Sequence, residues 1–247
     1  MVIDILTLFP EMCERVLNES IIGRARSADI VKIHCHNIRD YTEDKHGRVD
    51  DAPYGGGTGM IMQVQPIYDC YRHIQEMRGG KCHLIYMTPQ GKTLTQERVK
   101  ELSNMDNLAI LCGHYEGVDE RIIEEIVDEE ISIGDYVLTG GELPAMVLCD
   151  SICRMLPGVL RNSEAYTKES HYNYLLEYPQ YTRPAEWHEK NVPEVLVSGH
   201  HANIEKWQFE QSVRRTLLRR PELLNECNFT EKEWSAIQKI LQNTSDS

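Results

Sequence analysis

Residues 131–144 read ISIGDYVLTGGELP, and this stretch predicts how the rest of the chain is arranged. Its centre, residues 136–138, is a short apolar run (YVL) of the kind found in buried strands. A Gly-Asp turn precedes the run, and Gly140 and Gly141 follow it just before an expected helix. Glycines on both sides of a strand let the backbone approach a bulky ligand closely, although two ordinary turns would have the same pattern.

Two further segments also end an apolar run in a glycine-containing loop. Residues 86–91 read YMTPQG and residues 111–117 read LCGHYEG. Strand-like runs alternate with helical patterns from residue 2 to residue 156, which predicts an α/β fold with a largely parallel sheet. The carboxyl ends of parallel strands share one edge of a sheet, so the three glycine loops predict one ligand crevice at that edge.

Length and composition indicate an ordinary globular protein. The 247 residues are enough for one large or two small domains, and 41% of them are hydrophobic and 26% charged. No apolar run reaches the roughly 18 residues that a membrane span requires. The opening residues MVIDILTLFPEM include Asp4 and lack a basic stretch, so they do not resemble a signal peptide. We therefore expect a cytoplasmic protein with no membrane partner.

The cysteines predict reduced thiols rather than a metal centre. The chain has eight of them and no CxxC pair. Cys149 and Cys153 lie four residues apart on an expected helix, and Cys35 stands between two histidines, but no second ligand cluster completes a zinc site. We expect most of these thiols to be buried and none of them to bind a metal.

The charge distribution argues against general affinity for nucleic acid. The formal net charge is −13, and most of it belongs to residues 1–160, which hold 15 Lys and Arg against 26 Asp and Glu. Residues 161–247 are nearly balanced, with 11 against 13. Such a protein can bind RNA through local basic patches, and its non-specific binding should be weak and sensitive to salt.

We expect three parts along the chain. Residues 1–158 carry the α/β pattern, residues 159–177 are a polar and irregular linker, and residues 178–247 form a small, mainly α-helical domain. Arg214, Arg215, Arg219 and Arg220 lie near the end of one helix of the last part. This cluster is either an RNA contact or a solvated helix end favoured by the helix dipole.

A long stretch without periodicity, residues 37–59, interrupts the first part. It includes two aspartates, Asp50 and Asp51, and the glycine-rich sequence YGGGTG. Loops of this length are usually functional or mobile, and a solvated loop is the simpler alternative.

Several of these segments together resemble one protein family. VDDAPYGGGTGM, YMTPQG, LCGHYEGVDER and SIGDYVLTGGELPA are similar, in this order, to motifs of the bacterial tRNA (guanosine-37, N1)-methyltransferases. That family belongs to the SPOUT class of RNA methyltransferases, which use S-adenosyl-L-methionine (AdoMet). The resemblance runs from the opening DILTLFPEM to RRPELL, and it implies a deep trefoil knot in the sheet domain and a homodimer whose active site combines both subunits.

The resemblance also implies an AdoMet pocket formed by the three glycine loops. Its backbone would bind the edges of the adenine and the ribose, and Glu116 and Ser132 would face the polar end of the ligand. Glu116 is alternatively a ligand for Mg²⁺, an additional cofactor in the family, although the sequence has no built-in metal cage. The residues assigned to AdoMet are Tyr86, Met87, Thr88, Pro89, Gly91, Gly113, Tyr115, Glu116, Gly117, Ser132, Ile133, Gly134, Asp135, Tyr136, Val137, Leu138, Gly140, Gly141 and Pro144.

The resemblance implies further residues for tRNA binding and catalysis. The residues expected to hold tRNA are Asp50, Pro53, Tyr54, Gly55, Gly57, Gly59, Arg215 and Arg219. N1 of guanosine carries a proton, so methylation requires a base and a cation near the charge that develops on O6. The family positions of the base and the cation correspond to Glu169 and Arg154. Glu169 replaces the aspartate of well-known members, but both carboxylates have similar reference pKa values.

The sequence is also compatible with other interpretations. Without the resemblance, Glu169 is a surface carboxylate of a linker and Arg154 a surface ion-pairing residue. The chain could also be a SPOUT enzyme for another RNA base or a catalytically inactive RNA-binding module. A dinucleotide-binding dehydrogenase is disfavoured because no GxGxxG follows the first strand.

Overall fold

A computed structural model describes residues 1–161, 166–227, 229–231 and 233–238 of the chain. The chain forms two compact units, Met1–Asn162 and Ser163–Ser247, which are described separately. In the described part of the chain no helix is both long and apolar enough to cross a membrane. All eight cysteines are free thiols, and six of them are buried, as the sequence predicted.

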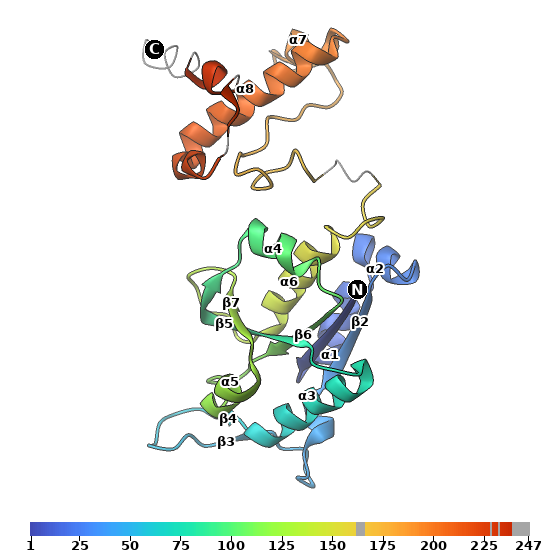
Figure 1. Ribbon diagram of the computed structural model, residues 1–247, viewed down its shortest axis with the longest axis vertical. Helices are drawn as coiled ribbons and strands as arrows, with labels where there is room; N and C mark the ends of the chain where they lie inside the picture. The colour runs from blue at the N-terminus through green and yellow to red at the C-terminus, as the bar shows by residue number, and fades with distance from the viewer. Residues whose placement is uncertain (162–165, 228, 232, 239–247) are drawn as a thin grey trace. The chain divides into compact units, whose positions relative to one another are not determined.

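The first unit contains a five-stranded sheet (Figure 1). The strand order is β2-β1-β6-β5-β7, and every pair of neighbours is parallel. The prediction of an α/β fold with a parallel sheet is therefore confirmed. The strands are β1 (Val2–Thr7), β2 (Lys32–Asn37), β5 (His83–Thr93), β6 (Asn107–Cys112) and β7 (Glu129–Ser132).

The central strands form because their apolar runs are buried on both faces, as parallel strands require. In β1, Ile3 and Ile5 are fully buried, and Ile5 pairs with Ile110 of β6. Nearly all of β6 is buried as well. These residues lie where the sequence has uninterrupted apolar runs, so burial explains why the strands were predicted correctly.

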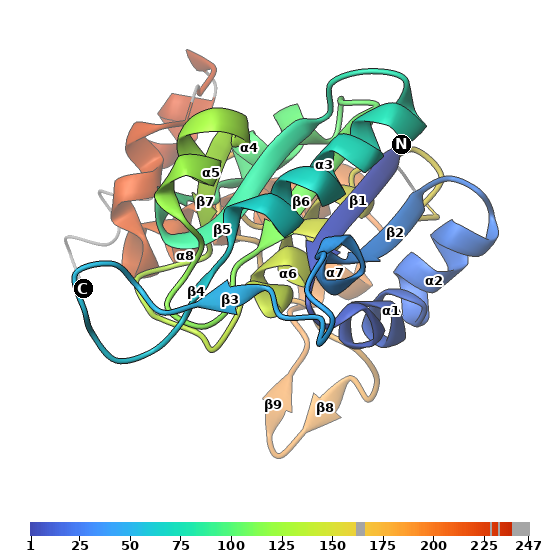
Figure 2. The same ribbon diagram turned by 90° about the horizontal axis from the view of Figure 1, so that it is seen from below.

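Helices cover both faces of this sheet (Figure 2). One layer contains α3 and α5, which pack against each other, and the other contains α6 with α1, α2 and α4 against it. The helices are α1 (Pro10–Leu17), α2 (Ser20–Ser27), α3 (Val64–Arg78), α4 (Gln96–Leu102), α5 (Glu120–Ile126) and α6 (Glu142–Cys153). Thr95 caps α4, because its Oγ1 accepts a hydrogen bond from Arg98 N.

A charged cluster lies inside the first unit. Asp4 of β1 is fully buried, and its carboxylate accepts two hydrogen bonds from the Arg78 guanidinium, at 2.8 and 2.9 Å. His36 Nε2 lies 2.7 Å from Asp4 Oδ1. Burial alone would raise the pKa of Asp4, but the hydrogen bonds with His36 and Arg78 hold it below its ordinary value. The buried charge is thus compensated by a bidentate partner, and the cluster joins β1, β2 and α3.

The stretch between β2 and α3 contains little regular structure. It includes a 3₁₀ turn, η1 (Ile38–Tyr41), and a small antiparallel pair, β3 (Asp50–Asp51) with β4 (Ile61–Met62). The remainder of this stretch is a mostly exposed loop that includes the glycine-rich sequence, although Val49 is buried in the core.

The second unit is built on one long helix, α8 (His201–Arg219), with the short α7 (Glu194–Val197) before it and a 3₁₀ turn, η2 (Pro221–Asn225), after it. Val213 of α8 is fully buried against other apolar side chains of the unit. A hairpin of β8 (Glu186–Trp187) and β9 (Lys190–Asn191) precedes α7.

Part of the predicted linker packs within this second unit. Leu176 N donates a hydrogen bond to Thr216 Oγ1 at 2.8 Å, and Thr216 is fully buried. Further along the chain, Thr230 and Glu233 form a capping box, since each side chain accepts a hydrogen bond from the other residue's backbone N–H. The apolar spacing of the sequence also predicts Ile240 and Leu241 on the inner face of the last helix, and these two lie outside the described residues.

Candidate active site

Three neighbouring strands end at the same edge of the sheet and enclose a cleft. The parallel order β6-β5-β7 brings the carboxyl ends of these strands together. The loops that follow β6 and β7, together with residues 86–90 inside β5, line a cavity of about 230 Å³. Its lining residues are Tyr86, Met87, Thr88, Pro89, Gln90, Gly113, His114, Tyr115, Glu116, Gly117, Ile131, Ser132, Ile133, Gly134, Tyr136, Val137, Leu138, Thr139, Gly140, Gly141 and Pro144.

An irregularity in β5 contributes one wall of this cavity. The pairing of β5 with β7 shifts register between Met87 and Lys92. Residues 88–91, which include Pro89, are therefore released from regular pairing. Proline lacks a backbone N–H and tends to occur where ladder hydrogen bonds are interrupted. The bulge explains how a segment inside a strand comes to line a cavity.

The loop that follows β7 forms a second wall, and here one prediction was wrong. Residues 136–138 are not a buried strand, because Tyr136, Val137 and Leu138 are 54%, 81% and 38% exposed. The strand is β7, which ends at Ser132. Ser132 Oγ then both donates to Gly134 O and accepts from Gly134 N, at 3.0 and 3.1 Å, and this turn ends the strand. The three apolar side chains form part of the cleft wall instead of the core.

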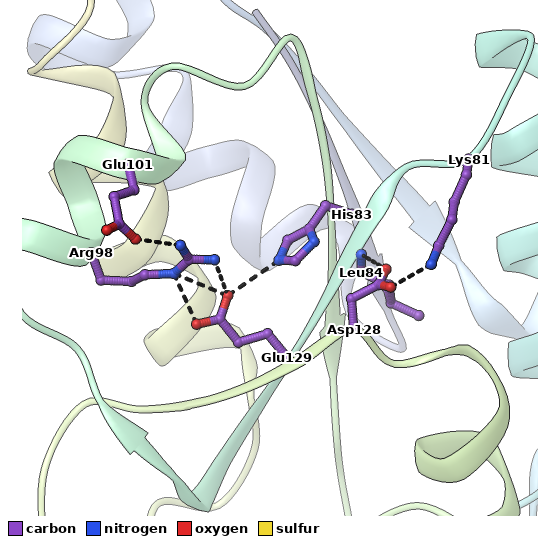
Figure 3. Close-up of polar contacts among 7 residues, drawn as sticks. All are labelled: Lys81, His83, Leu84, Arg98, Glu101, Asp128 and Glu129. Atoms are coloured by element: carbon purple, nitrogen blue, oxygen red, sulfur yellow. Dashed lines mark hydrogen bonds and ion pairs between the residues drawn. The ribbon is translucent and has the colours of Figure 1, made fainter.

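Partly buried ion pairs hold the start of β7 in place (Figure 3). Glu129 accepts hydrogen bonds from Arg98 Nε and Nη2 and lies 3.2 Å from His83 Nε2. Asp128 accepts from Leu84 N. Burial alone would raise the pKa of Glu129, but the bonds from Arg98 and His83 keep it below its usual value. These contacts fix β7 against β5 and thereby set the position of the cleft loop.

Glycines leave room inside the cleft that side chains would fill. A Cβ on Gly113 would come within 2.9 Å of the Tyr86 hydroxyl, and one on Gly140 within 2.8 Å of His114 Nδ1. Gly117 has a φ of +120°, which other residues adopt only with strain. The cleft therefore exposes bare backbone amides and carbonyls to a ligand, with the half-exposed rings of Tyr115 and Tyr136 beside them.

The glycine-rich loop lies next to this cleft. Glu116 N donates to Met60 O, and Met62 N donates to Gly117 O, both at 3.0 Å. A Cβ on Gly59 would come within 2.5 Å of the Glu116 side chain. Tyr54, at the tip of the loop, is fully exposed. Residues 60 and 62, directly after the predicted tRNA-binding segment, are thus hydrogen-bonded to the predicted AdoMet loop.

The comparison with known proteins identifies the family. The model of the family described as tRNA (Guanine-1)-methyltransferase TrmD matches residues 1–226. The chain belongs to this family.

Relatives in this methyltransferase family align over nearly their whole length. A tRNA (guanine-N(1)-)-methyltransferase of Ruminiclostridium cellulolyticum is 62% identical over 222 residues, covering 90% of this chain and 95% of the relative. Proteins of the same name from Syntrophomonas wolfei and Clostridium botulinum are 55% and 54% identical over 241 residues, covering 98% of this chain and 97% of each relative. The family resemblance stated from the motifs is therefore confirmed.

Methyltransferases of this family use AdoMet, and the cleft suits such a ligand. It offers free backbone hydrogen-bonding groups for the adenine and ribose edges and apolar side chains for the ring faces. In the described part of the chain no group of three or more His, Cys, Asp or Glu side chains is arranged to hold a metal ion.

Most residues assigned to AdoMet from the sequence meet at this cleft. Two do not. A Cβ on Gly91 would approach Glu130 C and Ile131 N within 2.4 and 2.5 Å, so this glycine permits close packing against β7. Asp135 is exposed and does not line the cleft. Sequence reasoning missed Gln90, His114, Ile131 and Thr139, all of which stand inside or beside the quoted motifs.

The residues predicted for catalysis fall in different units. Arg154 is the C-terminal cap of α6 in the first unit, and Glu169 belongs to the second. Glu169 lines a second cavity, of about 300 Å³, between residues 167–178 and α8. Of the predicted tRNA contacts on α8, Arg219 is exposed, while Arg215 Nη1 donates to Glu177 O at 3.4 Å.

Proposed function

We propose that this chain transfers the methyl group of AdoMet to N1 of guanosine 37 in tRNA, next to the anticodon. The observation that carries the proposal is the family match, which spans the cleft, Arg154 and Glu169. The experiment is incubation of the purified chain with labelled AdoMet and a tRNA transcript, followed by mass spectrometry of the nucleosides. Absence of 1-methylguanosine from the product would refute the proposal.

AdoMet would lie in the cleft at the ends of β5, β6 and β7. Backbone groups of residues 133–138 and 113–117 would bind its adenine and ribose, because their glycines leave these groups accessible. When bound, AdoMet supplies an activated methyl group on a sulfonium. The task of the protein is to orient that group and to remove the proton from the attacking nitrogen.

Glu169 is the proposed base. Its carboxylate would accept the N1 proton of the guanine, which makes N1 nucleophilic. Arg154 would stabilise the negative charge that develops on O6 when that proton leaves. A glutamate can perform this step in place of aspartate because the two carboxylic acids have similar reference pKa values, although its longer side chain needs a different backbone position.

The tRNA would contact both units of the chain. The glycine-rich loop, with Asp50, Pro53 and Tyr54, lies beside the cleft and would hold the target nucleotide against bare backbone. Arg215 and Arg219 of α8 would contact phosphates. This arrangement is supported by the hydrogen bonds that join Met60 and Met62, at the end of the loop, to residues 116–117.

Replacing Arg215 and Arg219 together by alanine should weaken tRNA binding and reduce the slope of log K against log salt by roughly 1–2. AdoMet affinity should not change. Filter binding of tRNA at several salt concentrations measures this slope. A matched control replaces Lys32 and Arg72 of the first unit, which are exposed, and should keep the wild-type slope. An unaltered slope in the α8 variant would mean that these arginines are only a solvated helix end.

We also propose a homodimer formed through α1 and α6. These adjacent helices expose large apolar side chains, namely Met12, Val16, Leu143 and Val147, which are 41–53% exposed. Leu143 stands next to Pro144 of the cleft, so a second copy docking there would also border the AdoMet site. Sedimentation equilibrium should give twice the mass of the chain, and a monomer at micromolar concentration would contradict this interface.

We infer that the cleft loops form a trefoil knot, with residues 178–247 as a helical tRNA-binding domain after a linker at residues 159–177. The family match supports the knot, and a bond from Gly141 N to Gly113 O joins two of these loops. The knot is tested by tracing the loops in an experimental structure. The linker is tested by limited proteolysis, which should cut between residues 158 and 178.

Mg²⁺ is proposed as an additional requirement, with Glu116 as the residue nearest to the polar end of the ligand. Activity that persists in EDTA would exclude it.

A cytoplasmic location is proposed because tRNA substrates are found there, and cell fractionation tests it.

A further inference from the structure

Glu142 is a buried carboxylate directly behind the wall of the cleft. It is the first residue of α6 and only 3% exposed. Its Oε1 accepts a hydrogen bond from Thr7 Oγ1 at 2.7 Å. Its Oε2 lies 2.5 Å from the point where a Cβ of Gly140 would stand, and Gly140 lines the cleft. The absence of a side chain at residue 140 is what allows the carboxylate to approach the cleft so closely.

The charge of this carboxylate lacks a cationic partner among the described residues. Asp4, the other fully enclosed acid of the first unit, forms an ion pair with Arg78. Glu142, in contrast, is hydrogen-bonded to a neutral hydroxyl, and no Lys or Arg of the described chain forms an ion pair with it. The N-terminus of α6 offers only partial compensation. Enclosing a carboxylate in this way is costly unless an opposite charge comes close.

His114 has a ring nitrogen at the same position that lacks a hydrogen-bond partner among the described residues. This atom, Nδ1, is buried and lies 2.8 Å from the position of a Gly140 Cβ, so it faces the same point as Glu142 Oε2. The ring itself is held between Phe9 and Tyr115, at centroid distances of 5.0 and 4.9 Å. An acceptor and an unpaired nitrogen therefore converge behind Gly140, whose backbone lines the cleft.

We propose that Glu142 supplies the negative charge opposite the sulfonium of bound AdoMet, and that it makes the cleft prefer this cation over the neutral product S-adenosylhomocysteine. The inference rests on the proposed function, because it requires AdoMet in this cleft. Methyl transfer removes the positive charge from the sulfur. Glu142 thus stabilises the substrate and not the product, so it is a specificity residue that favours product release.

Glu142→Gln removes the negative charge but keeps the shape of the side chain, and its amide oxygen can still accept the hydrogen bond from Thr7. Calorimetry with the full-length chain should show AdoMet binding roughly tenfold weaker, as expected for a unit charge at several ångströms in a partly buried site. Sinefungin, in which a protonated amine replaces the sulfonium, should weaken similarly. S-adenosylhomocysteine should bind as to the wild type. A matched control, Asp150→Asn on the exposed side of α6, should change none of the three affinities.

Equal weakening of AdoMet and S-adenosylhomocysteine would overturn the inference and make Glu142 a purely structural residue. Unchanged AdoMet affinity would overturn it as well. If Glu142→Gln does not fold, the pair Glu142→Asp and Glu142→Asn, which differ only in charge, gives the same comparison: the Asp variant should retain the preference for AdoMet and the Asn variant should lose it. Failure of the wild-type chain to bind AdoMet or methylate tRNA would instead refute the proposed function.

Discussion

Glu169→Gln is expected to lower the single-turnover rate of tRNA methylation by roughly 10²–10⁴-fold, the usual contribution of a general base. Glutamine keeps the shape of the side chain and removes the proton acceptor. Affinities for AdoMet and tRNA should change little, because the lost interaction belongs to the transition state. Rapid-quench measurement with enzyme in excess over tRNA isolates the chemical step from binding and product release.

The matched variant Glu169→Asp retains the acceptor but withdraws it by about one methylene. A misplacement on the order of 1 Å can cost up to about 10²-fold. The aspartate variant should therefore be impaired less than the glutamine variant. A parental rate for Glu169→Gln under these conditions would show that Glu169 is not the base, and Asp50 would become the better candidate.

Gly141→Val is expected to abolish AdoMet binding and also to lower the stability of the first unit. A Cβ at this position would come within 2.7 Å of Cys112 Cα and 2.9 Å of Gly113 N. These are backbone atoms at the end of β6, so they cannot rotate away as a side chain would. Relief requires the start of α6 to move, which breaks the bond from Gly141 N to Gly113 O. The cost should be about 2–4 kcal/mol, typical of severe overpacking.

Calorimetric titration with AdoMet and thermal unfolding measure the two effects of Gly141→Val. Gly80 offers a matched control, because a Cβ there would meet no atom within 4 Å and its backbone conformation is ordinary. Gly80→Val should bind AdoMet normally and unfold near the wild-type temperature. Normal AdoMet affinity in Gly141→Val would remove this loop from the binding site.

The sheet could be predicted from the sequence because its strands are buried on both faces. The apolar run at residues 107–112 indicates β6 in the sequence, since an apolar run between polar turns has few alternatives. The apolar run at residues 136–138 failed the same rule. These side chains line the open cleft instead of packing in the core, and the cleft cannot be seen in the sequence alone.

The cleft itself was predictable in outline because parallel strands place their carboxyl ends at one edge. The sequence could not predict where a Cβ on each individual glycine would point. Gly91 and Gly141 look the same in the sequence as Gly117, yet a Cβ on either of the first two would point at neighbouring backbone. Glu142 was missed for a related reason: it appeared to be only the start of a helix, and the hydroxyl that bonds to it, that of Thr7, lies 135 residues away in the sequence.

We propose that this chain methylates N1 of one particular guanosine. A decisive experiment compares two tRNA transcripts that differ only at position 37, guanosine in one and adenosine in the other, each incubated with the chain and labelled AdoMet. We expect label to enter the guanosine transcript alone, as 1-methylguanosine at position 37. Equal labelling of both transcripts, or label at another nucleotide, would contradict it.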